Sequence, residues 1–207
     1  MIKIKSQIDS IFPTPIYRSN IERNLTKQEL NFIEKEKNIL VKNQGNYTSK
    51  NNYILKNKSL IKIKDFLEIC VKNYFDNIVS PATKITPYIT QSWLNFTKIN
   101  EFHHTHCHPN SYISGVFYVK CDDGDSISFN KNVYNQIKIE ASKLNIFNSE
   151  SWDYSLKSGD IILFPSYLQH AVKIRNIDKS IRTSLAFNIF VKGNLGNNYN
   201  LTELILK

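Results

Sequence analysis

Four of the five histidines in this chain are clustered within six residues; they are His103, His104, His106 and His108. In a β-strand, alternate side chains lie on the same face, so His106 and His108 would point the same way. Two imidazoles in this arrangement can bind Fe, Zn, Cu or Ni. A third ligand must come from elsewhere, and His170 is the only histidine outside the cluster. The spacing therefore predicts a metal site with His106, His108 and His170 as its candidate ligands.

The remaining residues of the cluster are expected to play smaller parts. Cys107 lies between two candidate ligands and would face the other way on a strand, so we expect a small packed residue rather than a fourth ligand. His103 and His104 precede the pair and would lie on the approach to the site. The alternative interpretation of the whole cluster is a group of surface histidines in a polar loop.

A second pattern that could form a binding site lies in the segment 181–189, where polar and apolar residues alternate. Arg182, Ser184, Ala186 and Asn188 would share one face of a strand there. A guanidinium and a nearby hydroxyl can together bind a carboxylate, because the guanidinium offers a planar fork of donors. Alternation is also typical of any half-exposed strand, so the carboxylate site and plain packing both remain open at this point.

The elements around these residues fall into two regions. Helical spacing of apolar residues predicts helices over about 24–40 and 58–78, separated by a polar loop at Asn43–Asn52. From residue 85 onward the period changes to two, which predicts strands. The expected strands are 91–99, 111–120, 126–129, 135–140, 160–164, 171–174 and 181–191, with a last one within 201–206. Many short, closely spaced strands favour a sandwich or barrel over alternating α/β units.

Composition is consistent with one globular domain. The 207 residues are 41% hydrophobic and 12% aromatic, and no apolar run approaches the length of a membrane span. Three cysteines and the absence of an export signal favour a reducing cytoplasm, or a host cytoplasm if a phage encodes the protein. The net charge of +9 comes mostly from scattered lysines, so we expect no specific nucleic-acid partner, only weak binding that salt removes.

Taken together, the ordered motifs resemble the iron(II)/2-oxoglutarate-dependent dioxygenases, and in particular a small branch found in bacteria and phages. The resemblance begins at Ile11–Pro15, resumes at Ser92–Asn95 and is strongest over His103–Val119. It continues through Ser158–Ser166 and ends in the segment from His170 to Asn188. It covers most of the chain between Trp93 and Asn188.

The resemblance implies a mainly β protein with N-terminal helices, whose core is a double-stranded β-helix of the jelly-roll or cupin type. A single oxygenase domain would then fill 1–207, with a helical part at 1–84, the β-helix at 85–192 and a tail at 193–207. It also implies a reaction that uses Fe(II), 2-oxoglutarate and O2 and yields succinate and CO2. The prime substrate is not indicated, and a homodimer stays open. The rim elements expected to set specificity are the helical N-terminal part and the loop Lys131–Trp152.

By the same resemblance, each candidate residue has an implied role. His106, His108 and His170 would bind the metal, and Arg182 with Ser184 would bind the distal carboxylate of 2-oxoglutarate. The other residues assigned to the cosubstrate pocket are Tyr118, Asn95 and, further along the Arg182 face, Asn188.

One departure from the superfamily pattern matters for the chemistry. The usual ligand set is two histidines and one carboxylate, whereas this chain has His108 where the acid would stand, or Asn110 if the register shifts by two. Three imidazoles leave the site with one more positive charge and should bind Fe(II) less tightly. The alternatives are therefore a cupin-like metalloenzyme that does not use 2-oxoglutarate, including a zinc site, and a non-catalytic jelly-roll protein.

Overall fold

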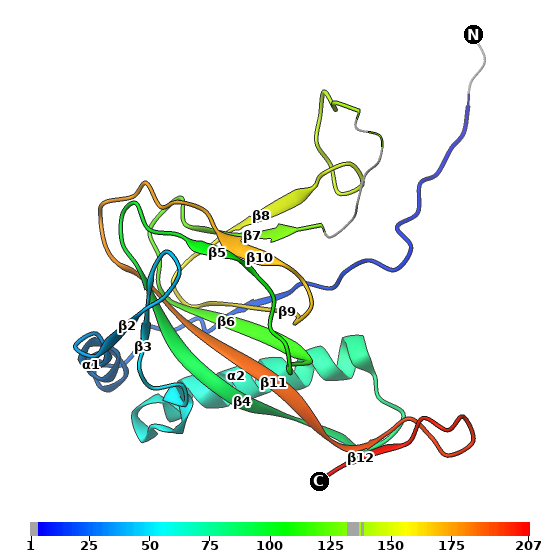
Figure 1. Ribbon diagram of the computed structural model, residues 1–207, viewed down its shortest axis with the longest axis horizontal. Coiled ribbons are helices and arrows are strands. Elements are labelled where there is room, and N and C mark those ends of the chain that lie inside the picture. The colour runs from blue at the N-terminus through cyan, green and yellow to red at the C-terminus, as the bar shows by residue number, and fades with distance from the viewer. Residues whose placement is uncertain (1–3, 132–136, 138) are drawn as a thin grey trace.

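The computed structural model describes residues 4–131, 137 and 139–207. Its core consists of two antiparallel sheets that face each other (Figure 1). In spatial order, the larger sheet contains β1 (Tyr17–Asn20), β9 (Asp160–Pro165), β6 (Ile113–Lys120), β11 (Arg182–Leu195), β4 (Ile85–Thr97), β3 (Tyr47–Ser49) and β2 (Leu40–Lys42), with β12 (Leu204–Leu206) paired to β11. The smaller sheet contains β5 (His103–His106), β10 (His170–Val172), β7 (Ser126–Asn130) and β8 (Ser151–Ser155).

The space between the two sheets is filled by apolar side chains from both of them. Tyr118, Ile162 and Phe164 of the larger sheet pack against Ile127 and Phe129 of the smaller sheet. This arrangement of two facing antiparallel sheets is the mainly β, jelly-roll architecture that the sequence predicts, and that prediction is confirmed.

The helices cover the outer face of the larger sheet, as Figure 1 shows for α2 (Ile61–Tyr74). Ile63, Leu67 and Val71 lie on one face of α2, at three-and-four spacing, and pack in one core with sheet residues such as Phe117 and Leu185. The helix is preceded by the short turns η1 (Ile54–Lys56) and η2 (Lys58–Leu60) and continues into the π-turn η3 (Phe75–Val79). No helix among the described residues is long and apolar enough to cross a membrane.

The first helix, α1 (Lys27–Glu36), is capped by Thr26 and ends four residues before the predicted end at about residue 40. The Thr26 hydroxyl accepts a hydrogen bond from the Glu29 backbone N–H, and the Glu29 carboxylate accepts one from the Thr26 N–H. This capping box satisfies two backbone donors at the helix start. Arg23 also donates two hydrogen bonds to the buried Glu29 carboxylate, which keeps its pKa below the ordinary value despite the opposing effect of burial.

The structure differs from the sequence prediction where strands are short. Segment Asn43–Asn52, expected to be a loop, instead contains the turn of a hairpin and its second strand β3, which pairs with β2 on one side and with β4 of the larger sheet on the other. β1 and β8 were likewise not predicted, since strands of three to five residues give little alternation and are stabilised by distant partners. The predicted strand at Asn135–Glu140 falls largely outside the described residues.

Candidate active site

The three candidate metal ligands come together at one end of the smaller sheet. His170 at the start of β10 lies directly opposite His106 at the end of β5. His108 lies two residues beyond β5 rather than on it, and its backbone N–H donates to Ser166 O. The Nε2 atoms of His108 and His170 are 3.3 Å apart, and the potential ligand atoms of all three histidines lie within 4.8 Å of one another.

Backbone carbonyls fix the orientation of two of these rings. His106 Nδ1 donates to His104 O at 2.8 Å, and His170 Nδ1 donates to Leu168 O at 3.1 Å. With the proton on Nδ1, each ring presents the lone pair of Nε2 to the site, which is how histidine ligands are normally held. Nitrogen ligands bound to one metal at about 2.1 Å lie roughly 3.0–3.4 Å apart when adjacent, so the observed spacing of 3.3 Å fits a metal ion.

The surroundings keep these imidazoles neutral. Burial, reinforced by the neighbouring imidazoles, lowers the pKa of His170 to about 2 and that of His108 to about 4. Burial also lowers the pKa of His106. All three rings are therefore neutral at pH 7, and each has one nitrogen lone pair available for a metal.

These shifts predict how the metal-free protein responds to acid. The folded-state pKa values lie below the ordinary value of 6.5, so the unfolded chain takes up protons first as the pH falls. The free energy of unfolding should therefore be lower at pH 5 than at pH 7, measured by urea denaturation in the presence of a chelator. A variant with His108 and His170 replaced by Gln should show a smaller difference, and an equal free energy at both pH values in the native sequence would contradict the prediction.

The residues assigned to the cosubstrate lie on three adjacent strands of the larger sheet. Ser184 on β11 is directly opposite Asn95 on β4 and Tyr118 on β6. These three side chains thus form one row across the inner face, and Arg182 lies two residues before Ser184 on the same face of β11. All four line the same narrow cavity as His106, His108 and His170, whose volume is about 30 Å³.

Two buried arginines of this chain differ sharply in their partners. Arg175 is 4% exposed and donates to Asp122, to Asp125 and to the backbone carbonyls of two residues of the same loop, Ile177 and Ser180. Arg182 is 3% exposed but makes a single hydrogen bond, from Nη1 to Ser126 O at 2.9 Å, and forms no ion pair with any described residue. An unpaired buried charge is costly, and the guanidinium carbon of Arg182 lies 5.3 Å from the centroid of the Tyr118 ring in a cation–π contact, with no described carboxylate beside it.

Two further polar atoms in the cavity wall also lack partners among the described residues. They are Asn95 Oδ1 and the Tyr118 hydroxyl, both fully buried. Burial raises the pKa of Tyr118, so its hydroxyl stays protonated and can donate a hydrogen bond. A guanidinium without a carboxylate partner and an unpartnered phenol, in the same cavity as the imidazoles, fit a small acid that also contacts a metal.

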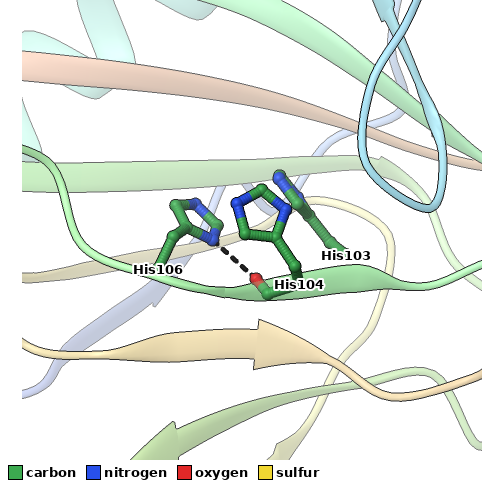
Figure 2. Close-up of side chains that lie close together, drawn as sticks. All are labelled: His103, His104 and His106. Carbon is green, nitrogen blue, oxygen red and sulfur yellow. Dashed lines mark hydrogen bonds between the residues drawn. The ribbon is translucent and has the colours of Figure 1, made fainter.

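Sequence reasoning missed one side chain of this cavity, His103. It was expected on the approach to the site, but a register shift between β5 and β10 puts His170 opposite His106 and Val172 opposite His103. Such a bulge changes which residues share a face, and no local sequence signal marks it. In Figure 2 the rings of His103 and His106 rise from the same side of β5, and they stack with centroids 4.4 Å apart.

The structure also places other candidates outside the cavity. Asn188 accepts a hydrogen bond from Ser114 Oγ at 3.3 Å and does not line the cavity that contains Arg182. Asn110 is exposed in a turn with a positive φ. Cys107 is an exposed free thiol rather than the packed residue that we expected.

A second histidine group has metal-like spacing. The possible ligand atoms of His103, His104 and His106 also lie within 4.8 Å of one another (Figure 2). However, His103 Nε2 already accepts a hydrogen bond from Asn43 Nδ2 at 3.1 Å, and His104 does not line the cavity that contains Arg182. The group of His106, His108 and His170 is therefore the better candidate.

Comparison with solved structures shows the same fold in several oxygenases. HygX from Streptomyces hygroscopicus, with nickel and 2-oxoglutarate bound, has a TM-score of 0.58 at 10% identity, over 85% of this chain and 82% of HygX. A prolyl hydroxylase from Trichoplax adhaerens has a TM-score of 0.58 at 14% identity, over 84% of this chain and 83% of that one. A Pseudomonas putida prolyl-4-hydroxylase gives 0.52 at 9% identity, with 84% and 92% covered. At these identities the likeness shows the fold, and it confirms the predicted double-stranded β-helix.

The family is given by the sequence of the β-helix itself. No curated protein matches the chain. Residues 91–188, which include every candidate metal and cosubstrate residue, match the family described as "Putative 2OG-Fe(II) oxygenase". The predicted cofactors, Fe(II), 2-oxoglutarate and O2, are those of this family. Over residues 91–188, this chain is therefore similar to the 2OG-Fe(II) oxygenases.

Proposed function

We propose that this protein is an Fe(II)- and 2-oxoglutarate-dependent hydroxylase. The observation that carries the proposal is Arg182, a buried guanidinium without a carboxylate partner among the described residues, facing the same cavity as three converging imidazoles. When bound, Fe(II) and 2-oxoglutarate supply the oxidising chemistry, in which O2 is consumed, succinate and CO2 are released and the prime substrate gains a hydroxyl group.

The protein's own residues hold and orient these groups. His106, His108 and His170 would bind the metal through Nε2, leaving further coordination positions open. Arg182 would hold the distal carboxylate of 2-oxoglutarate through its unused donors, with the Ser184 hydroxyl beside it. The Tyr118 hydroxyl would donate to a carboxylate of the cosubstrate, Asn95 would line the same pocket, and the apolar wall formed with Val116 and Ile127 would limit access of water.

Space for a prime substrate adjoins this cavity. A cavity of about 660 Å³ shares His108 with the metal site and lies between the loops after β5 and β9 and the end of α2. Its lining contains three tyrosines (Tyr74, Tyr112 and Tyr167) and no Lys, Arg, Asp or Glu. We therefore propose that the part of the substrate that enters is uncharged, and that the helical N-terminal region contributes to specificity through Tyr74.

Anaerobic visible spectroscopy tests this function. Addition of Fe(II) and then 2-oxoglutarate should produce a weak metal-to-ligand charge-transfer band, because the keto acid chelates the metal. Succinate, which lacks the keto group, serves as the control and should give no band. Bound Fe(II) without a band at saturating 2-oxoglutarate would contradict the proposal and favour the alternative, a cupin-like metalloenzyme that does not use this cosubstrate.

A further inference from the structure

His103 occupies an unusual position for a residue outside the metal-ligand set. The bulge between β5 and β10 turns its ring into the cavity that contains Arg182, where the ring stacks on His106. Val172, opposite His103, lines the same cavity, so the strand pair presents this part of the wall toward Arg182 and Ser184. His103 is thus placed beside both the metal site and the carboxylate site.

The hairpin of β2 and β3 fixes the tautomer of His103. Asn43 Nδ2 donates to His103 Nε2 at 3.1 Å and also to Asn46 Oδ1 at 3.0 Å. Since Nε2 accepts, a neutral His103 has its proton on Nδ1. Nδ1 makes no hydrogen bond to any described residue. The ring therefore offers one directed donor that the protein itself does not use.

The hairpin is itself anchored against β5 and β4. The Phe102 N–H donates to Gly45 O at the hairpin turn, and β3 pairs with β4 through Tyr47 and Thr48. Asn46 is 2% exposed, so the Asn43–Asn46 pair is held in a closed environment. These contacts make the position of Asn43, and through it the orientation of His103, a property of the fold.

We propose that His103 is a positioning residue for 2-oxoglutarate, whose Nδ1–H donates to the distal carboxylate alongside Arg182, and that Asn43 keeps that proton on Nδ1. This inference rests on the proposed function. It adds a second, neutral donor to the arginine and gives the β2–β3 hairpin a direct role in cosubstrate binding. The affinity for keto acids that lack the distal carboxylate should not depend on His103.

Calorimetric titration of the Mn(II)-loaded protein with 2-oxoglutarate and with pyruvate provides the test. Pyruvate has the same keto-acid group but lacks the distal carboxylate. His103→Phe keeps an aromatic ring against His106 and removes the donor, so it should weaken 2-oxoglutarate binding about tenfold or more and leave pyruvate and Mn(II) binding unchanged. His103→Asn, whose amide nitrogen lies near the position of Nδ1, should recover more affinity than His103→Gln, whose amide nitrogen lies near that of Nε2.

The hairpin offers a matched pair of variants. Asn43→Ala removes the hydrogen bond that keeps the His103 proton on Nδ1, so it should weaken 2-oxoglutarate binding by about 3-fold. Gln44→Ala removes a neighbouring side chain of the same hairpin and should have no effect. Normal 2-oxoglutarate affinity in His103→Phe, or equal losses for 2-oxoglutarate and pyruvate, would overturn the inference. Failure of the native protein to bind 2-oxoglutarate at all would instead contradict the proposed function on which the inference rests.

Discussion

Replacement of His170 by alanine should remove Fe(II) binding from this protein. His170 supplies one of the three imidazoles of the candidate metal site, and its Nε2 lies 3.3 Å from His108 Nε2. Loss of even an outer partner of a metal ligand typically costs 10- to 100-fold in metal affinity, so loss of the ligand itself should exceed about 100-fold. The measurement is metal content and Fe(II) titration under anaerobic conditions, on a variant whose circular dichroism shows that it is folded.

His104→Ala is the matched control, because it removes a histidine of the same cluster that does not line the cavity with Arg182. It should keep normal Fe(II) affinity. The opposite outcome, in which His104→Ala loses the metal and His170→Ala keeps it, would assign the site to His103, His104 and His106 instead. His106→Ala should lose the metal under either assignment, and retention of metal there with loss in Asn110→Ala would show that the register of the ligands is shifted.

Arg182→Ala should nearly abolish 2-oxoglutarate binding while Fe(II) binding is kept. A bidentate pair between guanidinium and carboxylate, formed away from water, contributes about 3 kcal/mol or more, which corresponds to about 100-fold or more in affinity. Arg182→Lys keeps the charge but loses the fork, so its affinity should be intermediate. The readout is succinate formation across a 2-oxoglutarate titration, together with the charge-transfer band under anaerobic conditions.

Arg175→Ala provides the contrast. Arg175 is as buried as Arg182, but its donors are occupied by Asp122, Asp125 and backbone carbonyls. Removing it leaves the buried Asp125 carboxylate without its ion-pair partner and should destabilise the fold by roughly 3–5 kcal/mol. The remaining folded protein should still bind 2-oxoglutarate normally. If Arg182→Ala behaved in the same way, with lower stability and an unchanged 2-oxoglutarate titration, Arg182 would be a structural residue and the 2-oxoglutarate assignment would lose its main support.

The sequence by itself determined the parts of this protein that depend on local pattern. Period-two alternation in β11 correctly put Arg182 and Ser184 on one face, because successive residues of any strand alternate between faces. Three-and-four spacing placed α2 and its buried face, and helical spacing also predicted α1, although over a longer range than the helix occupies. The ordered motifs indicated the oxygenase family that residues 91–188 match and, with it, the double-stranded β-helix fold.

Other features were decided only by tertiary structure, because each depends on residues far apart in the chain. The register shift between β5 and β10 moved His103 into the cavity, and the hairpin at Asn43 and Asn46 joined the sheet only through its pairing with β4. The distinction between Arg175 and Arg182 required knowing that Asp122 and Asp125 lie beside the first arginine and no described carboxylate beside the second. The sequence gives the type of each side chain, and the spacing of residues gives the face of the strand on which it lies. Its partners across the two sheets depend on non-local packing.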